Sequence, residues 1–197
     1  MNTRTIPKSE LILGGQKSGK SRRAEMLARQ WLDQADDHRA VMIATAQAWD
    51  DEMQQRIARH QVDRAQRVPG MTTVEEPVAL AEAIARYSQP ATLIVVDCLT
   101  LWLTNLLMPV GIPVFESNDG LTGKYTDDIA MLLIAIDDAP GPVILVGNEI
   151  GLGVIPMGRE VRAFVDALGR LNQDVAAACQ RVTLMAAGLP LTLKDCA

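Results

Sequence analysis

The chain alternates short apolar runs with longer amphipathic stretches, and this alternation limits the folds that it can adopt. Several runs are apolar throughout, as in parallel strands that helices cover on both faces. The expected strands are ELILGG (10–15), AVMIAT (40–45), TLIVVD (92–97), PVILVGN (142–148) and RVTLMAAG (181–188), with a weaker PLTLK at the end. The expected helices span about 19–34, 50–64, 77–87, 98–107, 125–137 and 159–179. This order predicts an α/β fold with three layers and a mostly parallel central sheet.

The length of the chain suits one domain. Its 197 residues can bury a core large enough to fold alone, so we expect a single domain over residues 1–197. Hydrophobic residues make up 48% and charged residues 22%, the balance of an ordinary soluble globular protein. The one loop-like tract is MPVGIPVFESNDGLTG (108–123), between two expected helices. It is predicted to be a long connection or lid within the domain.

Charge, hydropathy and cysteine content argue against several kinds of partner. The net charge is −5, so neither nucleic acid nor an anionic membrane is an expected partner, and an anionic ligand needs a local positive site. No apolar run approaches the roughly 20 residues of a membrane span, and MNTRTIPKSE lacks the apolar block of a signal peptide. The three scattered cysteines, Cys98, Cys179 and Cys196, predict free thiols in a reducing compartment, and hence a cytoplasmic location.

The strongest motif is a phosphate-binding loop. GGQKSGKS (14–21), called the phosphate loop below, fits G-x-x-x-x-G-K-[ST] and stands between an expected strand and an expected helix. Its glycines let backbone amides turn toward a polyphosphate, and the helix adds its positive dipole end. Lys20 is expected to reach the terminal phosphates and Ser21 to coordinate Mg²⁺. The motif predicts nucleoside triphosphate binding and a fold of the P-loop NTPase type.

Polar residues follow two of the expected strands. Asp97 ends TLIVVD, at the sheet edge where open α/β folds bind their ligands. A carboxylate at this place holds Mg²⁺ in phosphate-loop enzymes, directly or through water, so Asp97 is a candidate metal ligand. The alternative is that Asp97 caps the next helix. Asn148 and Glu149 follow VILVG, and they either contact substrate or shape the turn.

One of the two histidines lies in DDEMQQRIARHQ (50–61). Spacings of four and three residues place Met53, Ile57 and His60 on one helix face. Taken alone, this stretch indicates an amphipathic helix in which His60 packs rather than reacts. His38 lies in the expected loop DQADDHRA and is predicted to be a solvated surface residue.

Six stretches together resemble the bifunctional adenosylcobinamide kinase/adenosylcobinamide-phosphate guanylyltransferases of cobalamin biosynthesis. They are GGQKSGKSRRAE (14–25), IATAQAWDDEMQQRIARH (43–60), TVEEP (73–77), DCLTLWLTNLL (97–107), NEIGLGVIPMGR (148–159) and GRLNQ (169–173). They run through nearly the whole chain in the family's order. The phosphate loop is shared with many enzymes, whereas the stretches 43–60, 97–107 and 148–173 are far more specific.

The resemblance implies two activities on one fold. The first phosphorylates the aminopropanol hydroxyl of adenosylcobinamide with ATP or GTP. The second transfers GMP from GTP to that phosphate and gives adenosylcobinamide-GDP and pyrophosphate. In the family, a histidine after the DDEM-x-x-RI segment carries GMP covalently. His60 matches this histidine, so the resemblance implies that His60 reacts rather than packs. The family also implies a homotrimer with the active site near subunit boundaries.

The resemblance implies a set of nucleotide contacts as well. The matching residues in this chain are Gly14, Gly15, Gln16, Lys17, Ser18, Gly19, Lys20, Ser21, Ala44, Thr45, Ala46, Gln61, Val62, Asp63, Arg64, Glu75 and Asp97. The chain departs from the family between His60 and TVEEP. It has QVDRAQRVPGMT there, with Met71 near the place of a Trp that the family usually carries in a shorter segment.

The chemistry suits a histidine. A neutral imidazole, with an ordinary pKa of about 6.5, can attack an α-phosphorus near neutral pH and divide one hard transfer into two displacements. Arg64, with Arg56 or Arg59, would offset the charge on that phosphate. Two alternatives stay open. One is a simple small-molecule or nucleotide kinase without a covalent histidine, and the other is a regulatory NTP-binding switch.

Overall fold

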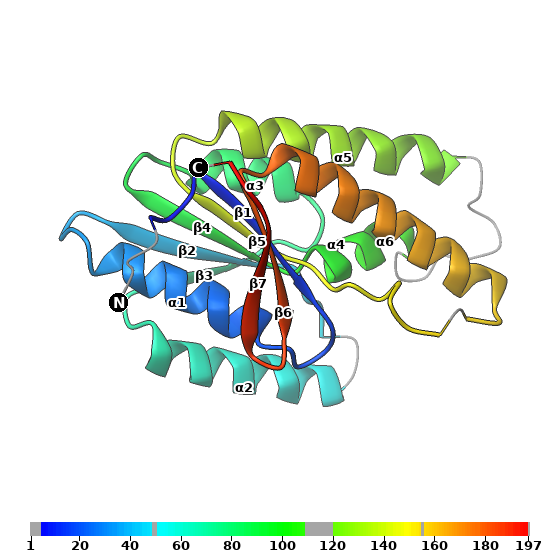
Figure 1. Ribbon diagram of the computed structural model, residues 1–197, viewed down its shortest axis with the longest axis horizontal. Coiled ribbons are helices and arrows are strands. Elements are labelled where there is room, and N and C mark those ends of the chain that lie inside the picture. The colour runs from blue at the N-terminus through cyan, green and yellow to red at the C-terminus, as the bar shows by residue number, and fades with distance from the viewer. Residues whose placement is uncertain (1–4, 49–50, 109–119, 155, 197) are drawn as a thin grey trace.

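The strands in the described part of the chain lie in one twisted sheet (Figure 1). The computed structural model describes residues 5–48, 51–108, 120–154 and 156–196, without the side chains of 52, 53, 56, 57, 60 and 121–124. Within these residues the sheet has the order β3-β2-β4-β5-β1-β6-β7. Its strands are β1 (Ser9–Gly14), β2 (Arg39–Ala44), β3 (Thr72–Glu75), β4 (Thr92–Asp97), β5 (Val143–Val146), β6 (Arg181–Ala186) and β7 (Leu189–Asp195). Neighbouring strands are parallel except β6 and β7, which form an antiparallel pair at one edge.

Helices cover both faces of the sheet. They are α1 (Lys20–Leu32), α2 (Asp51–Arg67), α3 (Leu80–Tyr87), α4 (Leu99–Leu107), α5 (Gly120–Asp138) and α6 (Arg159–Ala178). One apolar cluster joins α1 to residues such as Ile12 and Ile144, and the other joins α3, α4, α5 and α6 to residues such as Leu11 and Leu145. Because adjacent strand residues point to opposite faces, the continuous apolar runs supply both clusters. The prediction of a three-layer, mostly parallel α/β fold is therefore confirmed.

Several elements differ from the prediction. α2 continues to Arg67, beyond the predicted end at 64, and α3 begins at Leu80 rather than at 77. β3 was not predicted as a strand, because TTVE is short and mostly exposed at the sheet edge. The predicted helix 125–137 begins earlier, at Gly120, so residues 120–123 of the predicted loop 108–123 are helical. Residues 109–119 of that loop lie outside the described residues.

The three cysteines are free thiols, as predicted. Cys98, Cys179 and Cys196 are free, the first two buried and the third exposed. Among the described helices, none combines the length and the apolar character that crossing a membrane requires.

Candidate functional site

The phosphate loop connects β1 to α1, and its surroundings demand glycine at two positions. A Cβ atom on Gly14 would lie 2.5 Å from the Met185 carbonyl oxygen and 2.7 Å from the Ser18 hydroxyl oxygen. Gly19 precedes α1 with a φ of 101°, in the left-handed region that glycine adopts at little cost. The loop is therefore a tight turn that a side chain at either glycine would disrupt.

Hydrogen bonds hold the phosphate loop in place. The Ser18 amide donates to the Gly15 carbonyl (3.3 Å). The Gly188 amide, in the turn between β6 and β7, donates to the Ser18 carbonyl (3.0 Å). The buried ammonium of Lys20 donates to the Gly15 carbonyl at 2.6 Å. The loop thus combines a fixed cation with the positive dipole end of α1, and both favour a bound phosphate.

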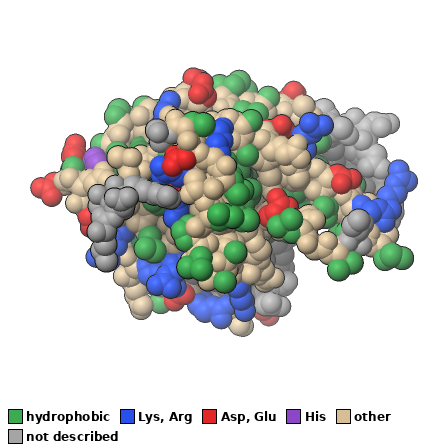
Figure 2. All heavy atoms as spheres, viewed as in Figure 1, with side chains coloured by type: hydrophobic (Ala, Val, Ile, Leu, Met, Phe, Trp, Pro, Cys, Tyr) green, Lys and Arg blue, Asp and Glu red, His purple; other side chains and the backbone are tan. Residues whose placement is uncertain are grey.

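A cavity of about 630 Å³ lies at the carboxyl ends of β1 to β5, where this loop, the second half of α2 and the strand ends meet. Its lining contains six lysines and arginines and three acidic residues, so positive charge is in excess. Figure 2 shows Lys and Arg side chains gathered over α1 and α2, along the lower side of the molecule. In a chain of net charge −5, this cavity is the local positive site that an anionic ligand needs.

Most of the predicted nucleotide contacts meet at this cavity. Those that line it are Gln16, Lys17, Ser18, Gly19, Lys20, Ser21, Ala44, Ala46, Gln61, Asp63, Arg64, Glu75 and Asp97. Within the described part of the chain, four others do not line it: Gly14, Gly15, Thr45 and Val62. Val62 is exposed on α2, and Thr45 is fully buried behind the strand ends. Segments far apart in the sequence are thus brought to one place.

His60 belongs to α2, and its side chain lies outside the described residues. Its two sequence neighbours, Arg59 and Gln61, both line the cavity. The predicted helix face shared with Met53 and Ile57 rests on side chains that are likewise not described. The α2 backbone therefore brings position 60 to the border of the same cavity as the phosphate loop.

His38 has a different environment from the one predicted. Its ring stacks on Trp31 with ring centroids 3.8 Å apart, and its Nδ1 lies 2.7 Å from the Trp31 carbonyl oxygen. His38 is half-buried, so it does lie at the surface as predicted, but one face of its imidazole is covered by the aromatic ring from α1 and is not solvated. His38 is a packing residue just before β2, at the opposite end of that strand from Ala44.

The turn after β5 separates the roles of Asn148 and Glu149. Asn148 lines the cavity, and its backbone amide donates to the Thr100 hydroxyl (2.9 Å). Glu149 instead accepts hydrogen bonds from the Gly151 amide (3.1 Å) and from the Asn172 side chain (3.4 Å). Of the two readings left open by the sequence, Asn148 has the position to contact a ligand and Glu149 shapes the turn.

Some cavity residues were not singled out from the sequence as ligand contacts. They are Arg22, Arg67, Thr73, Cys98, Leu101, Val146 and Ile150. Cys98 and Val146 stand at strand ends, where the rule for open α/β sheets could have found them. Arg67 and Thr73 had no such signal, because the predicted helix ended at 64 and β3 was not predicted.

Cys98 is the cavity residue whose chemistry could compete with a histidine nucleophile. Burial, with the negative charge of Asp97 as a second cause, raises the pKa of the Cys98 thiol to about 11. A thiol with this pKa stays protonated near neutral pH, and the thiolate is the nucleophilic form. Covalent chemistry on Cys98 is therefore disfavoured.

The fold resembles that of a solved structure with little sequence similarity. The flagellar accessory protein FlaH from Methanocaldococcus jannaschii matches with a TM-score of 0.53 and 13% identity. The match covers 96% of this chain and 80% of that chain. At this identity the likeness shows the fold alone, and it agrees with the mostly parallel sheet described above.

Sequence comparisons identify the family. The chain is 46% identical over 186 residues to the bifunctional adenosylcobalamin biosynthesis protein CobP of Pseudomonas aeruginosa, covering 94% of this chain and 96% of that protein. It is 35% identical over 187 residues to the bifunctional adenosylcobalamin biosynthesis protein CobU of Escherichia coli, covering 93% and 98%. Residues 10–193 match the family model described as cobinamide kinase / cobinamide phosphate guanyltransferase. The chain therefore belongs to the CobU family of bifunctional cobinamide kinases and cobinamide phosphate guanylyltransferases.

Proposed function

We propose that this chain phosphorylates adenosylcobinamide with ATP or GTP and then passes GMP from GTP through His60 to the new phosphate, on the single domain expected over residues 1–197. One observation carries the proposal: the phosphate loop and the residues on both sides of His60 line the same cavity. The phosphate loop would bind the triphosphate. Arg59 and Gln61 bring position 60 of α2 to the border of the cavity in which that triphosphate would lie. A simple phosphate-loop kinase needs no residue of α2 at this border.

In the kinase step, the acceptor hydroxyl attacks the γ-phosphorus, and the bond to the nucleoside diphosphate breaks. The hydroxyl proton leaves to solvent. Loop amides and the Lys20 ammonium stabilise the charge on the phosphates during this displacement. The Lys20 ammonium is held at 2.6 Å from the Gly15 carbonyl, so it is oriented before substrate binds.

In the guanylyl step, an imidazole nitrogen of His60 attacks the α-phosphorus of GTP, and pyrophosphate leaves. A phosphate oxygen of adenosylcobinamide phosphate then attacks the same phosphorus, which releases His60 and gives adenosylcobinamide-GDP. The two displacements replace one difficult transfer between two anions. Arg59 and Arg64 line the cavity and supply positive charge beside the α-phosphate.

Mg²⁺ fits the oxygen donors of this cavity. Ser21 and Asp97 both line it, and neither is fully exposed. Among the described residues, no group of three or more His, Cys, Asp or Glu side chains could form a metal cage. Mg²⁺ commonly takes one or two protein oxygens together with substrate phosphates, so Ser21 and Asp97 suffice. When bound, the ion would supply charge neutralisation on the phosphates.

The decisive experiment is labelling with GTP that carries a radioactive α-phosphate. A covalent, acid-labile adduct is expected on the wild-type protein and is expected to be lost in His60→Ala. The same variant is expected to keep measurable phosphorylation of adenosylcobinamide. Absence of an adduct on the wild-type protein, with phosphoryl transfer intact, favours the simple kinase. GTP hydrolysis alone, with no affinity for the corrinoid, favours the regulatory switch.

We also infer a homotrimer in the cytoplasm, with the active site near subunit boundaries. The homotrimer rests on the family resemblance. The cytoplasmic location rests on the three free thiols. Light scattering on the purified protein measures the assembly directly, and a monomer at micromolar concentration with full activity contradicts it.

A further inference from the structure

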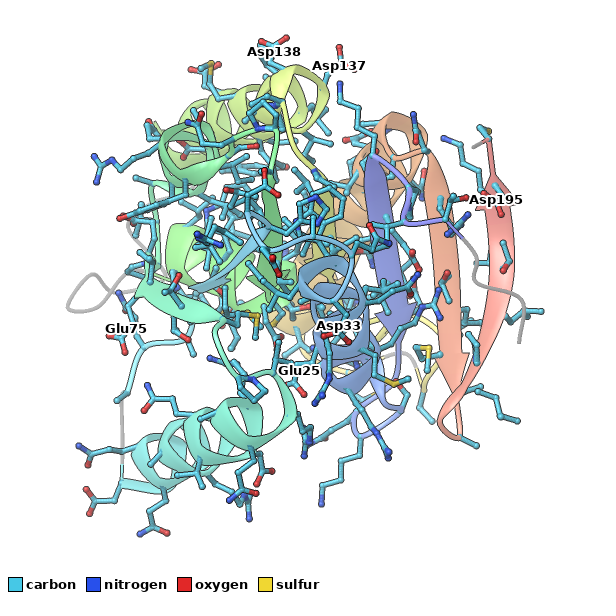
Figure 3. All side chains as sticks on the ribbon, turned by 90° about the vertical axis from the view of Figure 1, so that its left-hand side faces the viewer. Glu25, Asp33, Glu75, Asp137, Asp138 and Asp195 are labelled. Atoms are coloured by element: carbon cyan, nitrogen blue, oxygen red, sulfur yellow. The ribbon has the colours of Figure 1, made fainter. Side chains whose placement is uncertain are left out.

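The described contacts between helix α2 and the body of the protein lie at the carboxyl end of the helix. Among the α2 side chains that the structure describes, only Arg64 is buried. Val68, one residue beyond the helix, is 2% exposed and belongs to the apolar cluster beneath α1. Figure 3 shows α2 as a separate layer at the bottom of the molecule, with Glu25 above it. Among the described side chains of α2, those at the carboxyl end are therefore the ones that fix the helix against the body of the protein.

The central contact is a buried carboxylate from α1. Glu25 is 2% exposed and lies just over one helical turn after Lys20 of the phosphate loop. Its Oε2 accepts a hydrogen bond from Arg67 at 2.8 Å, and its Oε1 lies 4.0 Å from Nε of Arg64. Removing a carboxylate from water is costly unless positive charge and hydrogen bonds compensate it. Because the compensating groups come from α2, the carboxylate fixes that helix.

Further bonds restrict both arginines. Arg64 also donates to the Thr73 hydroxyl of β3 at 3.1 Å. Arg67 is bonded on three sides, because it also donates to Asp63 (3.2 Å) and its carbonyl accepts from Arg29 of α1 (3.1 Å). The hydrogen bond that Arg67 donates to Glu25 is the largest cause that raises the pKa of Arg67. The cluster thus joins α1, α2 and β3 at one point.

The positions of these arginines relate the cluster to the site. Arg64 and Arg67 follow His60 by four and seven residues, a spacing that puts all three positions on one helical face. Both arginines line the nucleotide cavity, whereas Glu25, among the described residues, does not. A shift of Glu25 would therefore change the rotation of α2 without removing any group that borders the nucleotide.

We propose that Glu25 is a positioning residue for guanylyl transfer: its contacts with Arg64 and Arg67 set the rotation and distance of α2 relative to the phosphate loop. The proposal rests on the proposed function, in which position 60 of α2 receives GMP. Phosphoryl transfer depends on the loop and on Lys20, and it requires no covalent group on α2. Loss of Glu25 is therefore expected to separate the two activities.

The test compares the two activities in Glu25→Gln, which keeps the side-chain shape and removes the charge. The rate of covalent labelling from α-labelled GTP is expected to fall roughly 10- to 100-fold, because small misplacements of a nucleophile have effects of this size. Phosphorylation of adenosylcobinamide is expected to stay within about twofold, since its machinery on the phosphate loop is unchanged. Equal loss of both rates, or wild-type labelling, overturns the proposal.

Glu10→Gln is the matched control. Glu10 is fully buried in β1 and accepts hydrogen bonds from Arg23 (2.8 Å) and from the Thr183 hydroxyl (2.8 Å). Among the contacts that the structure describes, it has none with α2. Its replacement is expected to lower both activities together, in proportion to the folded fraction measured by circular dichroism. A selective loss of labelling in Glu10→Gln contradicts the assignment to Glu25.

Two further results separate the possible failures. If the wild-type protein takes no label, the proposed function fails, whatever the role of Glu25. If the wild-type protein takes label and Glu25→Gln takes it equally fast, only the inference about Glu25 fails. Should Glu25→Gln not fold, Glu25→Asp keeps the charge but withdraws the carboxylate by one methylene. It is expected to slow labelling selectively, and an unselective loss of both activities overturns the proposal.

Discussion

The Thr45 hydroxyl bonds the backbone of Cys98 in both directions. It donates to the Cys98 carbonyl at 2.7 Å and accepts from the Cys98 amide at 2.9 Å. Thr45 follows β2 and Cys98 follows β4, so the pair ties together two strand ends beside Asp97. The resemblance implied that Thr45 contacts nucleotide. Its full burial indicates that the side chain acts by holding the edge of the cavity.

Thr45→Val is therefore expected to lower the free energy of unfolding by about 1–3 kcal/mol, because it takes the hydroxyl partner from the buried Cys98 amide and leaves the Cys98 carbonyl with the Trp102 amide alone (3.1 Å). Both activities are expected to fall, since Asp97 loses its support. Urea unfolding followed by circular dichroism measures the stability. Thr45→Ser keeps the hydroxyl and serves as the control. A valine variant as stable as the serine variant contradicts this role.

The two adjacent glycines of the phosphate loop offer a matched pair. Gly14→Ala is expected to lower the free energy of unfolding by about 1–3 kcal/mol, because its Cβ would press against the Met185 carbonyl and the Ser18 hydroxyl. Gly15→Ala has nothing within 4 Å of the new Cβ and is expected to have the stability of the wild type. Thermal unfolding of the two variants side by side checks the difference, and equal melting temperatures would refute it.

Lys20→Ala is expected to lower both activities by at least about 10²-fold, because each uses the same fixed cation on the phosphates. Rates with saturating GTP and corrinoid measure this loss. Lys8→Ala is the control, since the Lys8 ammonium is also bonded to a backbone carbonyl, that of Asp137 (2.7 Å), but outside the cavity lining. Loss of one activity alone in Lys20→Ala shows that the two reactions use separate phosphate sites.

Two buried thiols predict a loss of stability at alkaline pH. Burial raises the pKa of Cys98 to about 11 and that of Cys179 to about 12. As pH rises above the ordinary thiol pKa, the thiols ionise in the unfolded chain but not in the folded chain. The free energy of unfolding therefore falls by about 1.4 kcal/mol per pH unit for each thiol. Stability is thus full below that value and falls toward pH 11–12.

Cys179→Ala isolates this effect away from the nucleotide cavity. The variant is expected to lose less stability than the wild type between pH 8.5 and pH 10.5, roughly the range over which an unfolded thiol ionises first. Cys196→Ala, at an exposed thiol, is expected to follow the wild-type curve. Urea unfolding at a series of pH values measures both, and identical slopes for all three proteins contradict the assignment.

The sequence predicted those parts of the fold that depend on local pattern. β1, β4 and β5 are buried along their whole length or nearly so, and such strands are recognisable as continuous apolar runs. β3 escaped prediction because an edge strand of four residues has one half-buried side chain, Val74, and three exposed ones. The early start of α5 was hidden by the two glycines of GLTG, which favour loops over helices.

The site was predictable where one segment carries its own chemistry. The phosphate loop and Asp97 were predicted because a motif and a strand end are local features, and His60 was predicted through the resemblance. Glu25 was not predicted, since its proposed positioning role depends on contacts with Arg64 and Arg67, about forty residues later on another helix. Such a pairing arises from the packing of α1 against α2. The spacing of residues within either helix does not predict it.

The bond from the Gly188 amide to the Ser18 carbonyl links the first functional segment of the chain to its last hairpin. That donor exists only after the polypeptide has been synthesised through β6, so the phosphate loop gains this support long after its own residues have been made. A version of the chain shortened before β6 would keep every letter of GGQKSGKS and still lack the support behind it. The shape of the phosphate loop is in this sense a property of the folded sheet rather than of the motif.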